Sequence, residues 1–180
     1  MAAAGEMSAP AKEEVRTWNG GKLTLFATVL TGVVSLDIIT KLLIRRSFHL
    51  YEQANVIGDY LRITYIHNRG AAFGINLGPY SRYIFLVLSL VALVALAGMY
   101  WVTAARDRVR LTAISLICAG AIGNLLDRIR SHEGVVDFLD VGFRELRWPV
   151  FNVADVAVTV GAILLALSLW KEEQRPRSGP

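Results

Sequence analysis

Four long apolar stretches constrain the fold of this chain more than any other feature of its sequence. They cover residues 23–44, 83–105, 111–128 and 149–170. A helix of roughly 20 apolar residues crosses the ~30 Å hydrocarbon layer of a bilayer, and each stretch is about that long. Of the 180 residues, 54% are hydrophobic and 19% are charged, whereas a soluble domain carries about 25% charged residues. The pattern predicts a mainly α-helical membrane protein with four transmembrane helices.

Polar segments flank and separate these stretches. Residues 22–171 are predicted to form a single transmembrane domain between two tails, 1–21 and 172–180. The first tail is rich in Ala, Glu and Lys, lacks the apolar centre of a secretory signal peptide, and is expected to be flexible. Residues 61–66 alternate β-branched and aromatic side chains, which is typical of a short strand. A small sheet there should lie at the membrane surface, because an open sheet edge cannot face lipid.

Composition and motifs exclude several classes of function. The net charge is +4, and the basic residues alternate with apolar stretches, which indicates membrane-flanking charge more than a nucleic-acid surface. The single cysteine, Cys118, excludes an internal disulfide and a Cys-based metal cluster. His49, His67 and His132 lie in separate polar segments, where solvated side chains are expected. HExxH, GxSxG and Gly-rich phosphate-loop motifs are missing, so no metal or cofactor is predicted.

Charged residues occur inside the apolar stretches. Asp37 and Lys41 lie four residues apart, on one helix face, where they can form an ion pair. At ~1.5 Å per residue, Asp37 and Asp127 lie ~21 Å and ~24 Å along their helices, and Asp155 lies ~9 Å into the fourth. Since the fourth helix runs opposite to the first and third, these groups should gather at one depth, in the half of the membrane away from the termini. Such residues are costly in lipid and indicate a functional site, although the Asp37–Lys41 pair is equally consistent with a structural role.

Two aspartates have distinctive apolar surroundings, Asp137 in VVDF and Asp155 in FNVAD. Two neighbouring carboxyl groups do not both ionise readily, so one keeps a proton. Such a pair supplies a base to activate water and an acid to polarise a carbonyl, as in aspartic proteases. On spacing alone Asp37 and Asp127 are equal candidates, and Asp140 is a weaker one. The residues themselves leave three functions open: intramembrane hydrolysis, a proton or ion pathway, and a non-catalytic membrane scaffold.

Five sequence blocks, taken together, resemble the lipoprotein signal peptidases, also called signal peptidase II. The resemblance extends from about residue 23 to residue 170. It implies an aspartic endopeptidase of the bacterial inner membrane that cleaves the signal peptide of a prolipoprotein before a diacylglyceryl-modified cysteine. The blocks, in chain order, are SLDIITK at 35–41, NRGAAFG at 68–74, GNLLDR at 123–128, VVDFLD at 135–140 and FNVAD at 151–155.

The resemblance also assigns roles to residues. It implies that Asp137 and Asp155 are the catalytic pair, and we expect Arg128, positioned by Asp127, to hold a substrate carbonyl or lipid ester. The residues implied to bind substrate or support the site are Asp37, Lys41, Asn68, Gly70, Asn124, Asp127, Arg128 and Asn152.

The orientation in the membrane is not decided by charge. Counting the Lys and Arg residues on each side, with Arg128 at the very end of the third stretch included, gives nine on each side. The density of arginines in the short 106–110 loop is what favours that side as cytoplasmic. The resemblance implies the same orientation, with both termini cytoplasmic and a small β-cradle on the outer, periplasmic face. The expected partners are diacylglyceryl-modified prolipoproteins and membrane lipid, without nucleic acid or metal, and the chain is expected to be a monomer.

Overall fold

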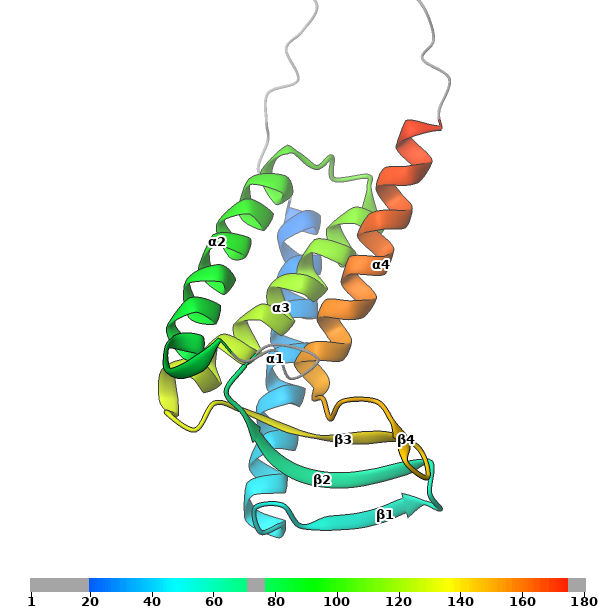
Figure 1. Ribbon diagram of the computed structural model, residues 1–180. Helices are drawn as coiled ribbons and strands as arrows, with labels where there is room; N and C mark the ends of the chain where they lie inside the picture. The colour runs from blue at the N-terminus through cyan, green and yellow to red at the C-terminus, as the bar shows by residue number, and fades with distance from the viewer. Residues whose placement is uncertain (1–19, 71–76, 175–180) are drawn as a thin grey trace, which may run out of the picture.

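A bundle of four helices stands on one side of a small antiparallel sheet (Figure 1). The computed structural model describes residues 20–70 and 77–174. Each helix in these ranges is long and apolar enough to cross a membrane. The predicted membrane protein with four spanning helices and a small sheet is therefore confirmed. The helices are α1 (Gly20–Ser47), α2 (Ser81–Val102, preceded by the 3₁₀ turn Gly78–Tyr80), α3 (Arg108–Arg130) and α4 (Val153–Glu173).

The sheet combines two segments that are far apart in the sequence. Its order is β1 (Gln53–Ile57), β2 (Leu61–Asn68), β3 (Val135–Phe143) and β4 (Leu146–Arg147), with every neighbour antiparallel. The strand predicted at 61–66 is confirmed and extends to Asn68. The sheet lies at the end of the bundle where α1 and α3 finish and where α2 and α4 begin (Figure 1).

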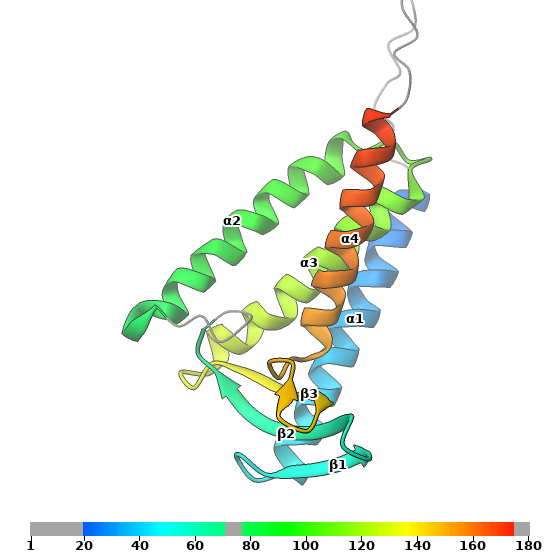
Figure 2. The ribbon, with the colours of Figure 1, turned by 45° about the vertical axis from the view of Figure 1, so that its right-hand side comes forward.

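The helix α3 forms the centre of the bundle. Its Leu111, Ile114 and Ala119 are buried, and it lies between the other helices in both views (Figures 1 and 2). The outer helices leave large apolar side chains exposed, such as Leu43 and Val94. On a membrane protein these side chains face lipid rather than water. Helix α2 diverges from α3 toward the start of α2 (Figure 2).

Glycines bring α3 and α4 into close contact. A Cβ atom on Gly120 would lie 2.2 Å from the Ala154 carbonyl oxygen, and one on Gly161 would lie 2.8 Å from the Ala113 carbonyl oxygen. Neither position has room for a larger side chain, so the two backbones approach directly. The small residues of α3 thus allow the tight helix packing that is common in membrane proteins.

Helix α4 begins at Val153, so the predicted start at Pro149 is wrong. Residue Phe151 instead pairs with Leu139 of β3, its N–H donating to the Leu139 oxygen at 3.0 Å. Asn152 then caps the helix: its side chain accepts from the Asp155 N–H, while the Asp155 carboxylate accepts from the Asn152 N–H. This reciprocal capping box fixes where the helix begins. It also places Asp155 in the first turn, closer to the helix end than the sequence suggested.

We expect Gly120→Ala to destabilise the protein, because the new methyl group would collide with the Ala154 backbone oxygen. Overpacking of this kind costs about 1–3 kcal/mol. Thermal unfolding of the purified protein in detergent measures the effect. Gly98→Ala is the matched control, since a Cβ atom there meets nothing within 4 Å and alanine favours a helix over glycine by about 0.5–1 kcal/mol. Equal melting temperatures for the two variants would contradict the close α3–α4 contact.

Candidate active site

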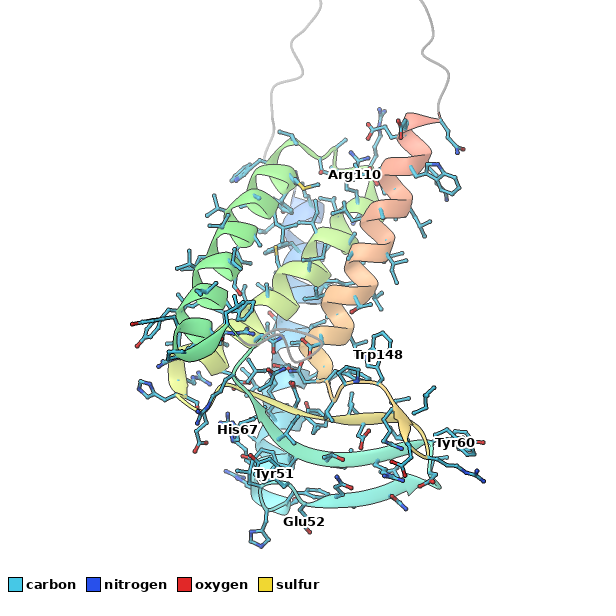
Figure 3. The ribbon with its side chains drawn as sticks, in the orientation of Figure 1. Tyr51, Glu52, Tyr60, His67, Arg110 and Trp148 are labelled. Carbon is cyan, nitrogen blue, oxygen red and sulfur yellow. The ribbon has the colours of Figure 1, made fainter. Side chains whose placement is uncertain are left out.

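Asp137 and Asp155 line one cavity of about 470 Å³ at the junction of the sheet and the bundle. Asp137 is the third residue of β3 and is buried, and Asp155 comes from the first turn of α4. Four further polar side chains, Asn68, Asn124, Arg128 and Thr159, line the same cavity. The rest of its wall is mainly apolar and includes Trp148, which precedes α4 (Figure 3). Residues from five elements or loops thus meet at one site.

Asparagine side chains hold both carboxylates in place. Asn152 Nδ2 donates to Asp137 Oδ1 at 2.7 Å, and Asn68 Nδ2 donates to Asp137 Oδ2 at 2.9 Å. Asn124 Nδ2 donates to Asp155 Oδ1 at 2.7 Å. Asn152 also donates to Asn124 Oδ1 at 3.1 Å, so the two sets of bonds form one network. Each carboxylate therefore has a fixed orientation toward the cavity.

The strand register explains how Asn68 reaches Asp137. Ile66 lies directly opposite Asp137 in the β2–β3 pair, and Asn68 is two residues further along. Residues two apart on a strand point to the same face, and diagonal neighbours are within reach of long side chains. Gly70 then donates its N–H to Asn68 Oδ1 at 2.9 Å, which orients the asparagine amide.

A chain of ion pairs lies behind the cavity. Lys41 Nζ is 2.7 Å from Asp37 Oδ2 and 2.9 Å from Asp127 Oδ2, and Arg45 is 3.2 Å from Asp127 Oδ1. The predicted Asp37–Lys41 pair is confirmed. Asp37 Oδ1 also accepts from the Ala154 N–H at 3.0 Å, so this carboxylate anchors the first turn of α4. Arg45 was missed by the sequence analysis, although it follows Lys41 by four residues and so lies on the same helix face.

The charges of this region balance when Asp137 and Asp155 share one proton. The carboxylates are Asp37, Asp127, Asp137 and Asp155, and the cations are Lys41, Arg45 and Arg128. Four negative and three positive groups leave one excess negative charge in a poorly solvated place, where an uncompensated charge is costly. A single proton on the carboxyl pair removes that excess.

Burial, and after it the charge of Asp155, raise the pKa of Asp137 to about 7, against the opposing hydrogen bonds from Asn68 and Asn152. Asp137 is thus the member of the pair that its surroundings favour in the protonated form near neutral pH. A protonated carboxyl group beside an ionised one is the arrangement that acid–base hydrolysis requires.

Three expectations about individual side chains are wrong. Asp127 pairs with Lys41 and Arg45 rather than positioning Arg128. Arg128 donates instead to the carbonyl oxygens of Gly70 at 3.0 Å and Asn124 at 3.3 Å.

His67 is the second correction: it is not a solvated loop residue but lies on β2, bonded to the Tyr65 hydroxyl at 2.9 Å and 3.3 Å from Glu133 (Figure 3). Asp140 is the third. It ties the sheet together, accepting from Arg147 at 2.6 Å and Thr64 at 2.8 Å, and it does not line the cavity. Within residues 20–70 and 77–174, no cluster of three His, Cys, Asp or Glu side chains is arranged to hold a metal ion.

The fold and the cavity define a multi-pass membrane protein with a buried and a partly buried aspartate, Asp137 and Asp155, near one end of its helices. The sequence profile of the family described as Signal peptidase (SPase) II matches residues 29–171. The chain therefore belongs to the signal peptidase II family and is a protease.

Relatives and solved structures agree with this family. The chain is 42% identical over 152 residues to a lipoprotein signal peptidase of Geobacter sulfurreducens, covering 84% of this chain and 94% of the relative. It is 45% identical over 146 residues to one of Halothermothrix orenii, covering 81% and 95%. A bacterial membrane enzyme solved by the in meso method at 2.3 Å resolution superposes with a TM-score of 0.79 at 31% identity, covering 88% of this chain and 94% of that one.

The raised pKa of Asp137 predicts how stability changes with pH. Between the ordinary pKa of 3.8 and about 7, the folded state binds more protons at this carboxyl group than the unfolded state. The free energy of unfolding should therefore fall as pH rises through this window, by at most about 4 kcal/mol. Asp137→Asn removes the titration, so we expect the variant to be more stable than the parent protein at about pH 8.

Thermal unfolding at about pH 5 and about pH 8 checks this expectation. Asp140→Asn is the matched control on the same strand. It should lower stability, because it breaks the ion pair with Arg147. A lower melting temperature of Asp137→Asn than of the parent protein at the higher pH would contradict the expectation. It would show that the ionised Asp137 carboxylate does not destabilise the folded protein, as its burial implies that it does.

Proposed function

We propose that this protease hydrolyses the peptide bond that precedes a diacylglyceryl-modified cysteine, and so removes the signal peptide of prolipoproteins, with Asp137 and Asp155 as its catalytic pair. The observation that carries the proposal is the shared cavity, which both carboxylates line together with apolar side chains. The carboxylates suit hydrolysis by activated water, and the apolar wall suits a lipid-bearing substrate. A proton pathway or a scaffold would not need both features in one place.

In the mechanism that we propose, a water molecule lies between the two carboxyl groups. Asp155, held by Asn124 and by the Asn152 N–H, removes a proton from this water. Asp137, which carries the shared proton at rest, donates a hydrogen bond to the scissile carbonyl oxygen. The water oxygen then bonds to the carbonyl carbon, and the C–N bond breaks as a proton passes to the leaving nitrogen. General acid–base steps of this kind contribute about 10²–10⁴-fold each.

The remaining residues around the cavity would bind the substrate. Arg128 donates to backbone carbonyls and lines the cavity, so its guanidinium could also hold a peptide or ester carbonyl of the substrate by charge-assisted hydrogen bonds. Val156 and Val160 line the cavity from α4 and are also exposed on the outside of the bundle. Acyl chains that enter from the lipid would lie along this face.

We further propose that the sheet lies at the outer face of the bacterial inner membrane and that both chain termini are cytoplasmic. Apolar side chains at the tip of the sheet support an interfacial position: Tyr60 stacks on Phe143 at 5.0 Å, and Leu146 is 88% exposed. Aromatic residues concentrate at membrane–water interfaces. At the other end of the bundle, the 106–110 loop carries the arginines expected on a cytoplasmic side. Residues 22–171 would act as one peptidase domain, in a monomer.

Purified protein incubated with a diacylglyceryl-modified precursor should release the signal peptide, and an unmodified precursor should react much more slowly. Asp137→Asn and Asp155→Asn should each reduce turnover by at least about 10²-fold, because each removes one acid–base group. Gel separation of precursor and product measures the rates. Asparagine keeps the shape of the side chain but only one of its two acceptor oxygens. The melting temperature of each variant therefore accompanies the rate, and folded protein is compared.

Asp140→Asn is the control for this experiment, since Asp140 lies on the same strand but outside the cavity. It should keep turnover within about tenfold of the parent rate when folded protein is compared. Full activity in either Asp137→Asn or Asp155→Asn would remove that residue from the pair. Equal rates on both precursors would show that the diacylglyceryl group is not recognised.

Asp37→Ala should lower activity less than either catalytic substitution. Asp37 accepts from the Ala154 N–H and pairs with Lys41, so its loss acts on the start of α4 rather than on the reaction itself. Leaving a buried N–H without a partner costs about 1–3 kcal/mol of stability. Asp37→Asn, which keeps an acceptor oxygen, should recover part of the melting temperature. Complete loss of turnover in Asp37→Ala at unchanged stability would contradict a structural role.

A further inference from the structure

A second cavity, of about 410 Å³, lies outside the active site. It is formed where β2 ends, where α2 begins and where the chain passes from α3 to β3. Its lining includes Arg69, Arg82 and His132, together with Ser81 and Tyr83. Neither carboxylate of the catalytic pair belongs to it, and the mechanism proposed above makes no use of these side chains.

The lining residues of this cavity carry positive charge without an acidic side chain among them. Arg82 is fixed in place: Nε donates to the Arg128 oxygen at 2.6 Å and Nη2 donates to the Ile129 oxygen at 3.2 Å, at the end of α3. The Arg69 side chain is exposed and forms no hydrogen bond or ion pair within the described part of the chain. Two guanidinium groups that face one cavity repel each other unless an anion lies between them.

His132 adds a hydrogen-bond donor to this cavity. Its Nδ1 lies 2.5 Å from Arg82 Nη1, and because a guanidinium can only donate, Nδ1 is the acceptor. The neutral ring then carries its proton on Nε2. The neighbouring acidic residue, Glu133, is 3.3 Å from His67 and does not line the cavity. The positive charge of the cavity is therefore not neutralised by that carboxylate.

The position of the cavity indicates the kind of anion. It lies at the end of the bundle that carries the sheet, and Tyr80 and Tyr83 beside it are exposed. Exposed tyrosines at the end of a membrane-spanning helix are typical of the depth of lipid headgroups. The anions concentrated at that depth are phosphate groups, whose oxygens match the planar donors of arginine.

We propose that this cavity binds the phosphate group of a phospholipid headgroup, held by Arg69, Arg82 and His132. The volume is in the range of small-ligand sites. The cavity also shares a wall with the active site. Gly134, which lines it, has φ +105°, and a Cβ atom there would lie 2.3 Å from the Asn68 oxygen. A bound headgroup therefore lies next to the asparagine that orients Asp137.

Binding of a short-chain phosphatidylglycerol to the purified full-length protein in detergent tests this proposal. Native mass spectrometry at increasing lipid concentration gives the affinity. Arg69→Gln should weaken binding by about tenfold, the usual consequence of losing one charge-assisted contact. Arg46→Gln is the matched control, because Arg46 is also exposed at the sheet end of the bundle but does not line the cavity. It should change the affinity by less than about twofold.

Two further probes identify the ligand group and its source. A diacylglycerol with the same acyl chains lacks the phosphate and should bind at least about tenfold more weakly. If inorganic phosphate displaces the lipid, the site also takes free phosphate, and if it does not, the headgroup of a lipid is the ligand. Equal affinity of Arg69→Gln and the parent protein, or equal affinity for the two lipids, would overturn the proposal.

A check on folding accompanies these measurements. Arg69→Gln should have the melting temperature of the parent protein without lipid, since its side chain is exposed. Arg69→Lys keeps the charge but loses the planar pair of donors, so it should bind with intermediate affinity. If Arg69→Lys binds the lipid as weakly as Arg69→Gln and its melting temperature is unchanged, the result still supports a guanidinium contact. Full lipid affinity in both variants would contradict that contact. Cleavage of precursor is not measured, so the outcome is independent of the proposed peptidase chemistry.

Discussion

The requirement that buried charges be neutralised determines the arrangement of this protein around its cavity. Lys41 lies between Asp37 and Asp127, and Arg45 completes the pairing of Asp127. A buried ion pair contributes little net stability, but removing one of its partners strongly destabilises the protein. This series of ion pairs therefore fixes the geometry more than it adds stability. The same requirement favours a single proton on the pair of Asp137 and Asp155, which we propose to be catalytic. The structural ion pairs and the proposed chemistry therefore depend on one balance of charge.

The sheet and the bundle are joined at the residues that form the site. Phe151 bonds to Leu139 of β3, and the next residue, Asn152, both caps α4 and donates to Asp137. One asparagine thus connects the strand that carries one carboxylate to the helix that carries the other. A shift of the β2–β3 register by one residue would turn Asp137 to the opposite face of the sheet. The register, the capping box and the cavity are consequently parts of one arrangement.

Periodicity and spacing predicted what depends on local chemistry. The apolar stretches predicted the spanning helices, and the four-residue spacing predicted the Asp37–Lys41 pair. Periodicity did not place β3 beside α4, because residues 135–139 read equally well as a buried helix or a strand. The pairing of Asp137 with Asp155 was expected from the resemblance to a family. Pro149 suggested a helix start, but the capping box at Asn152 is the stronger signal. Arg128 was expected to be the partner of Asp127 because the two are adjacent in sequence. Adjacent residues on a helix point in different directions, so this expectation was wrong.

The position of each aspartate in its element gives the two carboxyl groups different electrostatic surroundings. Asp155 is the third residue of α4, where unpaired N–H groups and the helix dipole favour negative charge. Asp137 lies on a strand, which has no comparable dipole, and burial favours its protonated form. The asymmetry follows from secondary structure together with burial, before any substrate binds. In the proposed mechanism, a base at a helix start and an acid on a strand, both near the membrane surface, would let water reach the carboxylates while acyl chains stay in lipid.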